Sequence, residues 1–370
     1  MSGLWFPNQS AATLLRVVAD PAAGRGLTLD DWDRLVRVGR ASRLLGTLRQ
    51  RLADSGELAG VPERVRNHLD SEAAAARYRK QLALRDLHAL AEVLRELPGP
   101  IVLLKGAAYI VQGLRIAGGR TVSDVDLLVP RDRLAGVEAR LREAGWTPGE
   151  VDPYDERYYR EWSHEVPPMR FPGGQLELDL HHGILPPISR VTMDPAPLFA
   201  ASRPVPGAAF RVLAPEDQVL HACVHAFVDS DLADRLRDIV DLDGLLRELA
   251  ATPGFWDRLC ARAEAFGLAR ALWYGLRYSS LALATPVPQP VWRALETHAP
   301  NAFVRRVMDW LVGNVTPPAP IDERAPPGLG FARNLAVLRY FWLRMPLPIL
   351  LRHAAVKGVR RIFPRAASAP

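Results

Sequence analysis

Two aspartates separated by one residue begin an apolar stretch in the first half of the chain. The segment from Asp124 to Val129 reads DVDLLV. Residues two apart on a β-strand project from the same face, so the carboxylates of Asp124 and Asp126 are expected to lie side by side. Their mutual repulsion would be relieved by a divalent cation with oxygen ligands, such as Mg²⁺. The spacing therefore predicts a strand that carries a metal site, with both aspartates facing a solvent-filled cleft.

A strand and a glycine turn are expected just before this pair. Residues 101–104 form a short apolar run that is typical of a buried strand, and Lys105-Gly106 then interrupts it before a helical pattern. A glycine at a helix start lets backbone N–H groups approach a phosphate, although Gly106 can also simply end the strand. Lys105 is expected to contact a phosphate, or else to be a solvated or structural lysine. Together with the aspartates, this turn favours metal-assisted phosphoryl or nucleotidyl transfer.

A third carboxylate is expected on a later strand. The segment from residue 176 to residue 182 reads LELDLHH, in which leucines alternate with polar residues. This period of two predicts a strand with Glu177, Asp179 and His181 on one face. Such a strand can lie beside the first and add a carboxylate to the same cluster.

These three blocks resemble a known family. The chain is similar to the nucleotidyltransferase superfamily, which has the polymerase-beta-like fold. More narrowly, it resembles a largely uncharacterised bacterial nucleotidyltransferase-like family with LKG, DVDLLV and DLH blocks. Here those blocks are residues 104–106, 124–129 and 179–181, and the resemblance covers roughly residues 25 to 250.

The resemblance implies an α/β (α+β) nucleotidyltransferase-like core with a mixed sheet, flanked by N- and C-terminal helical segments. It implies that Asp124 and Asp126 hold Mg²⁺ or Mn²⁺, and that Asp179 completes the metal site or takes a proton from the acceptor. Glu177 shares the face of Asp179 and is the alternative third carboxylate. His181 is expected to help hold the acceptor, to bind metal, or to be structural. The superfamily often has Gly-Ser or Gly-Gly in the turn, so Gly106-Ala107 lacks the usual hydroxyl.

The expected reaction is the transfer of a nucleoside monophosphate from an NTP, with ATP favoured, to an unidentified hydroxyl or amine on a small molecule or a protein. Arg115 and Arg120 precede the aspartates, and their guanidinium groups suit a triphosphate, although each can equally be a surface arginine. A non-catalytic nucleotide-binding or partner-binding protein that retains the fold is the alternative, and a small-molecule phosphotransferase is a third possibility.

Other histidines are weaker candidates. His221 and His225 lie four residues apart on a predicted helix, a spacing that can bind zinc. Neither they nor His164-Glu165 complete an HExxH pattern, so a packed or hydrogen-bonded role is favoured for the pair.

The chain divides by pattern into four segments. Residues 1–97 are predicted to be helical, with Asp30 capping one helix, and residues 98–215 to form the nucleotidyltransferase core. Within that core, residues 131–144 are predicted to be a helix and residues 150–172 an irregular excursion. Residues 216–315 are predicted to be helical again, and residues 316–370 to be a Pro-rich linker followed by a basic amphipathic tail.

Charge and composition indicate which partners and which cell compartment to expect. The formal net charge is +6, but residues 331–370 carry eight Lys and Arg and no acidic residue. The rest of the chain is therefore slightly acidic, and its charge gives no strong indication of nucleic-acid binding. Two cysteines make no disulfide framework and fit a reduced cytoplasm. Neither a secretory signal nor a membrane-spanning run is expected. The tail is expected to pack on the core, or to contact a membrane surface or a protein peripherally.

Overall fold

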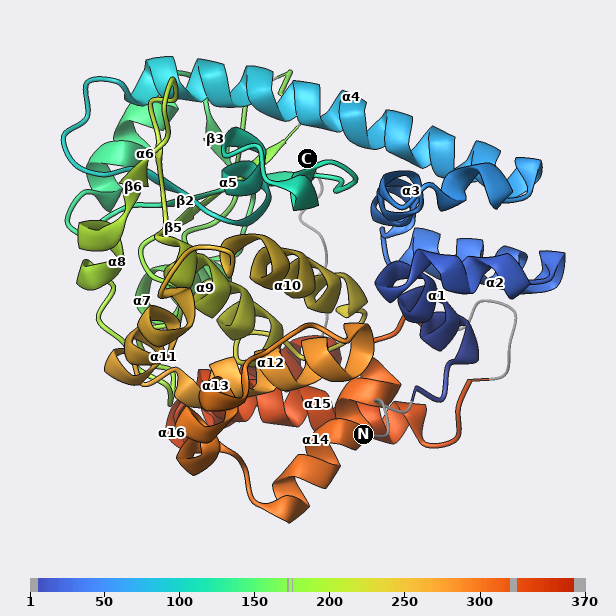
Figure 1. Ribbon diagram of the computed structural model, residues 1–370. Coiled ribbons are helices and arrows are strands. Elements are labelled where there is room, and N and C mark those ends of the chain that lie inside the picture. Colours follow the sequence, from blue (N-terminus) through green and yellow to red (C-terminus); the bar gives the residue numbers. More distant parts are fainter. Residues whose placement is uncertain (1–5, 172, 175, 320–324, 363–370) are drawn as a thin grey trace.

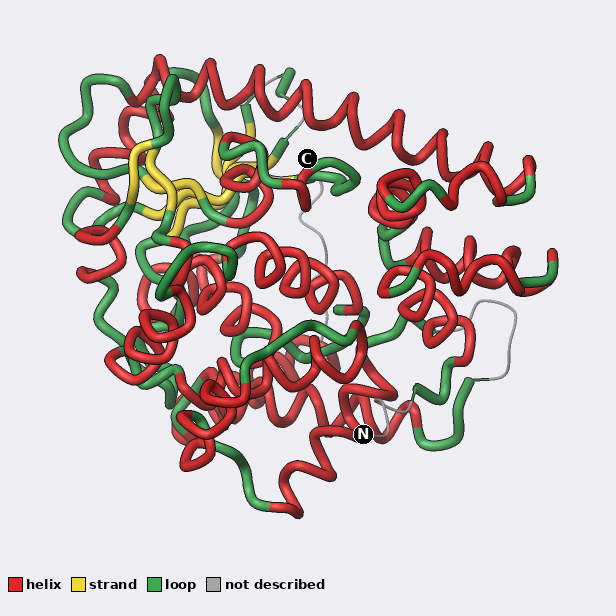
Figure 2. The backbone as a smooth tube through the Cα atoms, in the orientation of Figure 1, coloured by secondary structure: helices red, strands yellow, loops and turns green. Residues whose placement is uncertain are grey.

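A seven-stranded mixed sheet lies among helices in the computed structural model, which describes residues 6–171, 173–174, 176–319 and 325–362. The strands gather in one part of the molecule, and helices make up most of the rest (Figures 1 and 2). The strands are β1 (Val102–Leu103), β2 (Asp124–Leu128), β3 (Thr147–Pro148), β4 (Met169–Arg170), β5 (Glu177–His181), β6 (Arg203–Pro204) and β7 (Arg211–Val212). This is the predicted α+β nucleotidyltransferase-like architecture.

The N-terminal region is helical, as predicted. Its helices are α1 (Gln9–Ala19), η1 (Pro21–Gly26), α2 (Leu29–Ala41), α3 (Leu45–Asp54), η2 (Glu57–Gly60) and α4 (Glu63–Leu94). Helix α2 is capped by Thr28, whose side chain forms a capping box with Asp31, so the prediction that Asp30 caps it is wrong.

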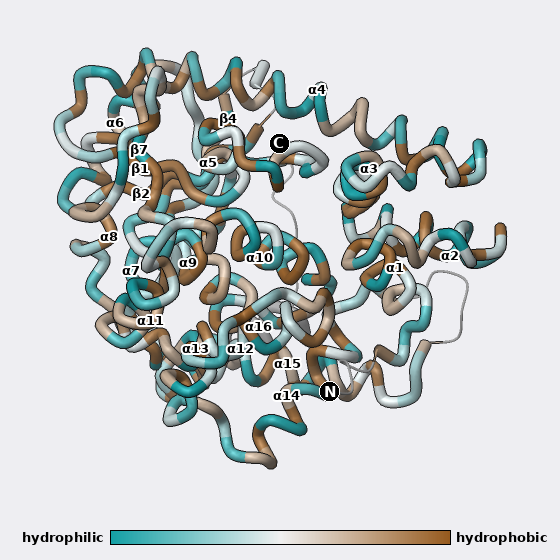
Figure 3. Tube along the Cα trace, in the orientation of Figure 1, coloured by the Kyte–Doolittle hydropathy of each residue, from teal (hydrophilic) through white to brown (hydrophobic). Residues whose placement is uncertain are grey.

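Helix α4 links the N-terminal helices to the sheet region. It is 32 residues long, or roughly 48 Å at 1.5 Å per residue. It contacts α3 near its start and α5 (Lys105–Val111) and α6 (Leu134–Glu143) further along (Figure 1). Hydrophilic and hydrophobic residues alternate along it (Figure 3), and its buried positions form a single apolar stripe.

The sheet order, β3-β4-β5-β2-β1-β7-β6, places the two carboxylate strands side by side at its centre. Strand β2 pairs in parallel with β5, while β1 pairs antiparallel with β2 and parallel with β7. Helix α5 follows β1 directly and packs on β2. After β2, the predicted helix is present as α6, and Gly145, with φ +94°, follows its end.

The predicted irregular excursion over residues 150–172 is wrong, because it contains helix α7 (Pro153–Trp162). Asp152 caps this helix by accepting hydrogen bonds from the backbone of Tyr154 and Asp155, and Pro153 occupies its first turn. Charged pairs four residues apart, such as Arg157–Glu161, then support it. The segment was predicted to be irregular because it is rich in tyrosine, proline and charged residues, although it forms a well-capped helix.

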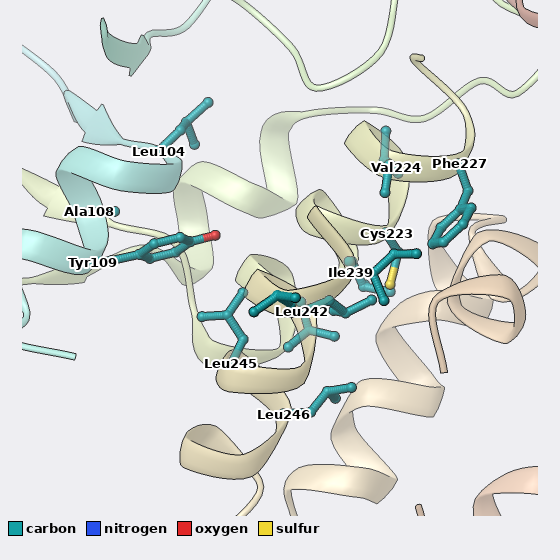
Figure 4. Close-up of a cluster of buried hydrophobic side chains, with 14 of the residues drawn as sticks. Leu104, Ala108, Tyr109, Cys223, Val224, Phe227, Ile239, Leu242, Leu245 and Leu246 are labelled. Carbon is teal, nitrogen blue, oxygen red and sulfur yellow. The ribbon is translucent and has the colours of Figure 1, made fainter. Parts of the chain in front are cut away.

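The C-terminal half is mostly helical and packs below the sheet (Figure 1). Its helices are α8 (Ala196–Ala201), α9 (Pro215–Phe227), α10 (Leu236–Leu249), α11 (Phe255–Ala265), α12 (Ala269–Leu283), α13 (Gln289–Ala294), η4 (Glu296–His298) and α14 (Ala302–Val315). Buried side chains of α5 face those of α9 and α10 across one apolar cluster (Figure 4). That packing fixes the start of α5, and hence Lys105, relative to the sheet. The predicted boundaries at residues 97, 215 and 315 stay predictions.

The basic tail forms helices α15 (Leu329–Arg344) and α16 (Leu347–Ile362), separated at Met345-Pro346. Helix α15 packs on α14, and Arg344 at its end is buried. Part of the predicted linker, residues 320–324, lies outside the described residues. Large apolar side chains remain exposed on this part of the chain: Phe331, Leu338, Trp342, Leu347 and Leu351. Peripheral contact of the tail with a membrane or a protein stays a prediction. Within the described part of the chain, no helix has the length and apolarity needed to cross a membrane.

Candidate active site

The register of β2 with β5 brings the predicted carboxylates together. Asp126 pairs with Asp179, and Asp124 pairs with Glu177. Paired residues in a parallel ladder project from the same face, so four carboxylates share one face of two adjacent strands. Asp124 and Asp179 are half-buried, whereas Asp126 is only 3% exposed.

Asp126 is covered by two cationic or protonatable groups. Lys105 Nζ and His181 Nε2 each lie 3.0 Å from Asp126 Oδ1. Burial opposes ionisation of this carboxyl, but Lys105 and His181 outweigh burial and hold the pKa of Asp126 well below its usual range. The expectation that both aspartates face solvent is therefore wrong for Asp126, because these two side chains cover it.

Lys105 is held in an uncommon backbone conformation. Its φ is +43°, in the left-handed region, which costs a non-glycine residue about 1–3 kcal/mol. Burial lowers the pKa of Lys105, but Asp126 outweighs burial and raises it, so the ammonium group stays charged. The turn thus delivers a fixed positive charge to the carboxylate cluster.

Asp179 has the opposite electrostatics from Asp126. Burial, together with the negative charge of Asp126, raises the pKa of Asp179 to about 7. Its neighbour Glu177 is instead bound by Arg170, whose Nε donates to Glu177 Oε1 at 2.7 Å. The two candidates for the third carboxylate therefore differ. Among the described residues, Asp179 forms no ion pair with a lysine or an arginine, and it lies near the negative charge of Asp126.

Arg120 occupies the space in front of Gly106. A Cβ at Gly106 would collide with the Arg120 guanidinium, which also donates from Nε to Asp241 Oδ2 at 2.8 Å. The same guanidinium lies over the Tyr109 ring, 5.5 Å from its centroid. Burial disfavours the charged form, but Asp241, and to a smaller extent Asp124, raise the pKa of Arg120. Glycine at position 106 thus permits close packing of a buried arginine that lies within electrostatic reach of the carboxylates.

Arg115 is not brought to this cluster. It lies in η3 (Arg115–Ala117), and its guanidinium pairs with Asp54 at 3.0 Å. Its backbone N–H bonds to Glu248, and with these residues it lines a pocket between α3 and α10.

A polar cavity of about 210 Å³ adjoins the cluster, and sequence reasoning did not identify it. It brings together side chains from six separate parts of the chain: Lys105, His164, Glu165, His181, Ile184, His221, His225, Asp229, Arg235 and Arg344. Arg344 comes from the basic tail, and its Nη1 donates to Asp229 Oδ1 at 2.6 Å. His164 and Glu165 follow the unpredicted helix α7. In the sequence, the His164-Glu165 pair was the only indication of this cavity, and the pair matches no motif.

His221 lines this cavity in its neutral form. Burial lowers its pKa to about 3, whereas an unfolded histidine titrates near 6.5. Between those pH values the unfolded chain binds the extra proton, so the contribution of His221 to stability is full above pH 6.5 and is lost as the pH falls. The His221→Gln variant should therefore lose less stability than wild type between pH 7 and pH 5, by about 2 kcal/mol.

Urea unfolding of both proteins at several pH values measures this difference. Other groups with shifted pKa values, such as Asp179, titrate in both proteins and cancel in the comparison. Parallel pH profiles for wild type and His221→Gln would contradict the assignment.

The carboxylate cluster fits a divalent cation. Mg²⁺ is bound in proteins through one or two carboxylates, with water and phosphate oxygens completing the octahedron. Asp124 and Asp126 supply such a pair, and Asp179, with its raised pKa, marks an excess of negative charge that a cation would neutralise. Among the described residues, the oxygens of these three carboxylates do not all lie within 4.8 Å of one another. Two of them suffice.

One of the comparisons with known proteins identifies the family of the chain. A family model described as "Uncharacterised nucleotidyltransferase" matches residues 28–284. No curated protein matches the chain. Among solved structures, the crystal structure of JHP933 from Helicobacter pylori is similar at 15% identity, covering 63% of this chain and 97% of that one, with a TM-score of 0.30. A likeness at that TM-score carries no argument about the site. Because the family match spans more than half of the chain, the protein belongs to the uncharacterised nucleotidyltransferase family.

Proposed function

We propose that the protein transfers a nucleoside monophosphate from an NTP, with ATP favoured, to a hydroxyl or amine acceptor on a small molecule or a protein. The observation that carries the proposal is the parallel register of Asp126 with Asp179 beside Asp124. It gathers the paired carboxylates and a third one on adjacent strands, in a chain of nucleotidyltransferase family.

In this proposal Asp124 and Asp126 hold Mg²⁺ or Mn²⁺, and Asp179 lies beside them. A bound divalent ion would neutralise charge on the α-phosphate and on the departing pyrophosphate. Lys105 keeps the buried Asp126 ionised and therefore able to bind a cation, since it holds the pKa of that carboxyl low. Arg120, fixed by Asp241, supplies positive charge on the same side of α5.

Asp179 is proposed as the group that takes the acceptor's proton. A general base must lie within reach of the acceptor's proton, and the strand register places Asp179 beside Asp126, where the pKa of its carboxyl is raised in the absence of a metal ion. The acceptor oxygen or nitrogen would attack the α-phosphorus as the bond to the β-phosphate breaks. A carboxylate oxygen of Asp179 would receive the proton, and pyrophosphate would leave.

The test compares the two candidates for this role. Asp179→Asn should reduce turnover of ATP by about a hundredfold or more while changing Mg-ATP affinity little, because a positioned base contributes about 10²–10⁴ to the rate. Glu177→Gln is the matched control, since that residue lies on the same strand face and is bound by Arg170. Calorimetry with Mg-ATP gives affinity, and pyrophosphate release in the presence of a cell lysate gives turnover. The reverse ranking of the two variants would transfer the role to Glu177.

A second candidate is a nucleotide-binding or partner-binding protein without turnover. The turn favours it: Gly106 faces Arg120, and no hydroxyl follows the glycine. The same assays separate the two functions, because this candidate predicts Mg-ATP binding with no pyrophosphate release from any lysate fraction.

A further inference from the structure

The polar cavity beside the carboxylate strands contains a second set of metal-type donors. His164, Glu165 and His181 each offer one ligand atom, and these atoms all lie within 4.8 Å of one another. The backbone fixes the three residues together, because Glu165 and His181 form an antiparallel bridge. The N–H of His182 also donates to the His164 carbonyl at 2.8 Å. The backbone at the end of β5 thus holds the cluster together, so it is not a chance meeting of long side chains.

His181 is oriented as metal-binding histidines are. Its Nε2 donates to Asp126 Oδ1 at 3.0 Å, which leaves Nδ1 pointing away from that carboxylate. This Nδ1 is buried, has no hydrogen-bond partner among the described residues, and lies 3.7 Å from Glu165 Oε2. Histidine ligands usually bond a carboxylate or carbonyl through one ring nitrogen while the other nitrogen binds the metal.

His164 is also buried beside a carboxylate. It is 6% exposed, its Nε2 lies 3.6 Å from Asp229 Oδ2, and its Nδ1 has no hydrogen-bond partner in the described part of the chain. Two buried ring nitrogens without partners, in neighbouring residues, require an explanation, because buried polar atoms are nearly always satisfied. A shared cation would satisfy both.

The ion pairs around the cavity also favour a cation, because its lysine and arginines are already paired with other carboxylates. Lys105 is paired with Asp126, and Arg344 with Asp229. Arg235 is paired with Asp238. Among the described residues, His181 is the one basic side chain within 4.0 Å of the Glu165 carboxylate. Lys105 and Arg344 act on Glu165 from a longer distance, so within the described part of the chain this carboxylate forms no direct ion pair with a lysine or an arginine.

We propose that His164, Glu165 and His181 bind one first-row transition-metal dication of the Zn²⁺ type. Ligand atoms of a tetrahedral zinc lie roughly 3.4 Å apart, so the 3.7 Å between His181 Nδ1 and Glu165 Oε2 needs little closure. Imidazole nitrogens select such metals over Mg²⁺, which prefers oxygen. The cavity of about 210 Å³ leaves a coordination position open for water or a substrate oxygen. This site shares no ligand with the Asp124–Asp126 pair, although His181 contacts Asp126 through its other ring nitrogen. Its binding of metal does not depend on nucleotidyl transfer.

The experiment uses the full chain, stripped with a chelator and then titrated with Co²⁺ and with Zn²⁺ in the absence of nucleotide. Wild type should bind one equivalent of Co²⁺ with visible d–d absorption, and Zn²⁺ should displace it while millimolar Mg²⁺ should not. His164→Gln and Glu165→Gln should each weaken Co²⁺ affinity at least tenfold. His221→Gln, which changes another histidine of the same cavity, is the matched control and should bind Co²⁺ as wild type does.

Two further measurements distinguish loss of the metal site from unfolding and from loss of the proposed Mg²⁺ site. Circular dichroism and melting of each stripped variant show whether it is folded, and Glu165→Gln changes only a half-buried carboxylate. Asp124→Asn should leave Co²⁺ binding intact, which separates this site from the proposed Mg²⁺ site. The proposal is overturned if stripped wild type shows no stoichiometric Co²⁺ absorption, or if a folded His164→Gln, Glu165→Gln double variant binds Co²⁺ equally well.

Discussion

Asp126→Asn is expected to reduce ATP turnover by at least about a hundredfold and to destabilise the protein as well. The carboxylate is one of the two proposed to hold the divalent ion, whose charge stabilisation is worth several kcal/mol, and each 1.36 kcal/mol is tenfold in rate. Asparagine also removes the charge that Lys105 and His181 contact at 3.0 Å, so a largely buried ammonium group loses its counter-ion. Pyrophosphate release measures turnover, thermal melting measures stability, and calorimetry with Mg-ATP measures nucleotide affinity.

Asp124→Asn separates the loss of function from the loss of stability. Asp124 is half-buried, and its one hydrogen bond to a described side chain is a 3.4 Å contact from Ser123. The Asp124→Asn variant should therefore lose Mg²⁺-dependent nucleotide binding while it melts like wild type. Asp132→Asn, an exposed change just beyond β2, should alter neither property. Wild-type Mg-ATP affinity in both Asp124→Asn and Asp126→Asn would refute the assignment of the metal pair.

Arg344→Met is expected to destabilise the protein by roughly 3–5 kcal/mol, because it breaks a buried ion pair by removing one partner. The Arg344 side chain is 7% exposed, and its guanidinium donates to Asp229 Oδ1, to the Tyr158 hydroxyl and to the Tyr340 hydroxyl, each at 2.6 Å. Burial already raises the pKa of Asp229 despite this pairing, so the carboxyl would be left buried without its counter-charge. Urea unfolding monitored by tryptophan fluorescence measures the loss.

Arg333→Met is the matched control on the same helix. Arg333 pairs with Asp234 at 3.2 Å, and both side chains are at least a third exposed, so the change should cost under about 1 kcal/mol. The double variant Arg344→Met, Asp229→Asn should recover part of the stability lost in Arg344→Met, since it removes the orphaned charge. If Arg344→Met and Arg333→Met proved equally mild, the tail would not be part of the core as described.

The sequence predicted the strands that carry the carboxylates, but it did not predict which side chains cover Asp126. A period of two over residues 176–182 and the DVDLLV block both correspond to real strands, because alternation reflects a strand with one apolar and one polar face. The neighbours of Asp126 depend on tertiary packing instead. Lys105, which was expected to contact a phosphate or to be a solvated or structural lysine, bonds Asp126, and Gly106 faces Arg120.

The cavity lay beyond sequence reasoning for a related reason. Arg344 reaches Asp229 across 115 positions and Ser163 across 181 positions, and no periodicity in one chain encodes such contacts. His164 and Glu165 follow helix α7, which was hidden by its composition although Asp152 and Pro153 mark its start. A search for N-caps before charged segments would have found the helix, but only the folded chain places its end beside His181.

The most direct test of nucleotidyl transfer is to compare ATP labelled at the α-phosphate with ATP labelled at the γ-phosphate. Each is incubated with Mg²⁺, a cell lysate and the purified protein, with the Asp124→Asn variant as the control. Nucleotidyl transfer predicts that the α-label enters a new product, that the γ-label appears only in pyrophosphate, and that Asp124→Asn forms neither. Transfer of the γ-label to an acceptor would identify a phosphotransferase and contradict the account, as would binding of ATP with no release of pyrophosphate in any fraction.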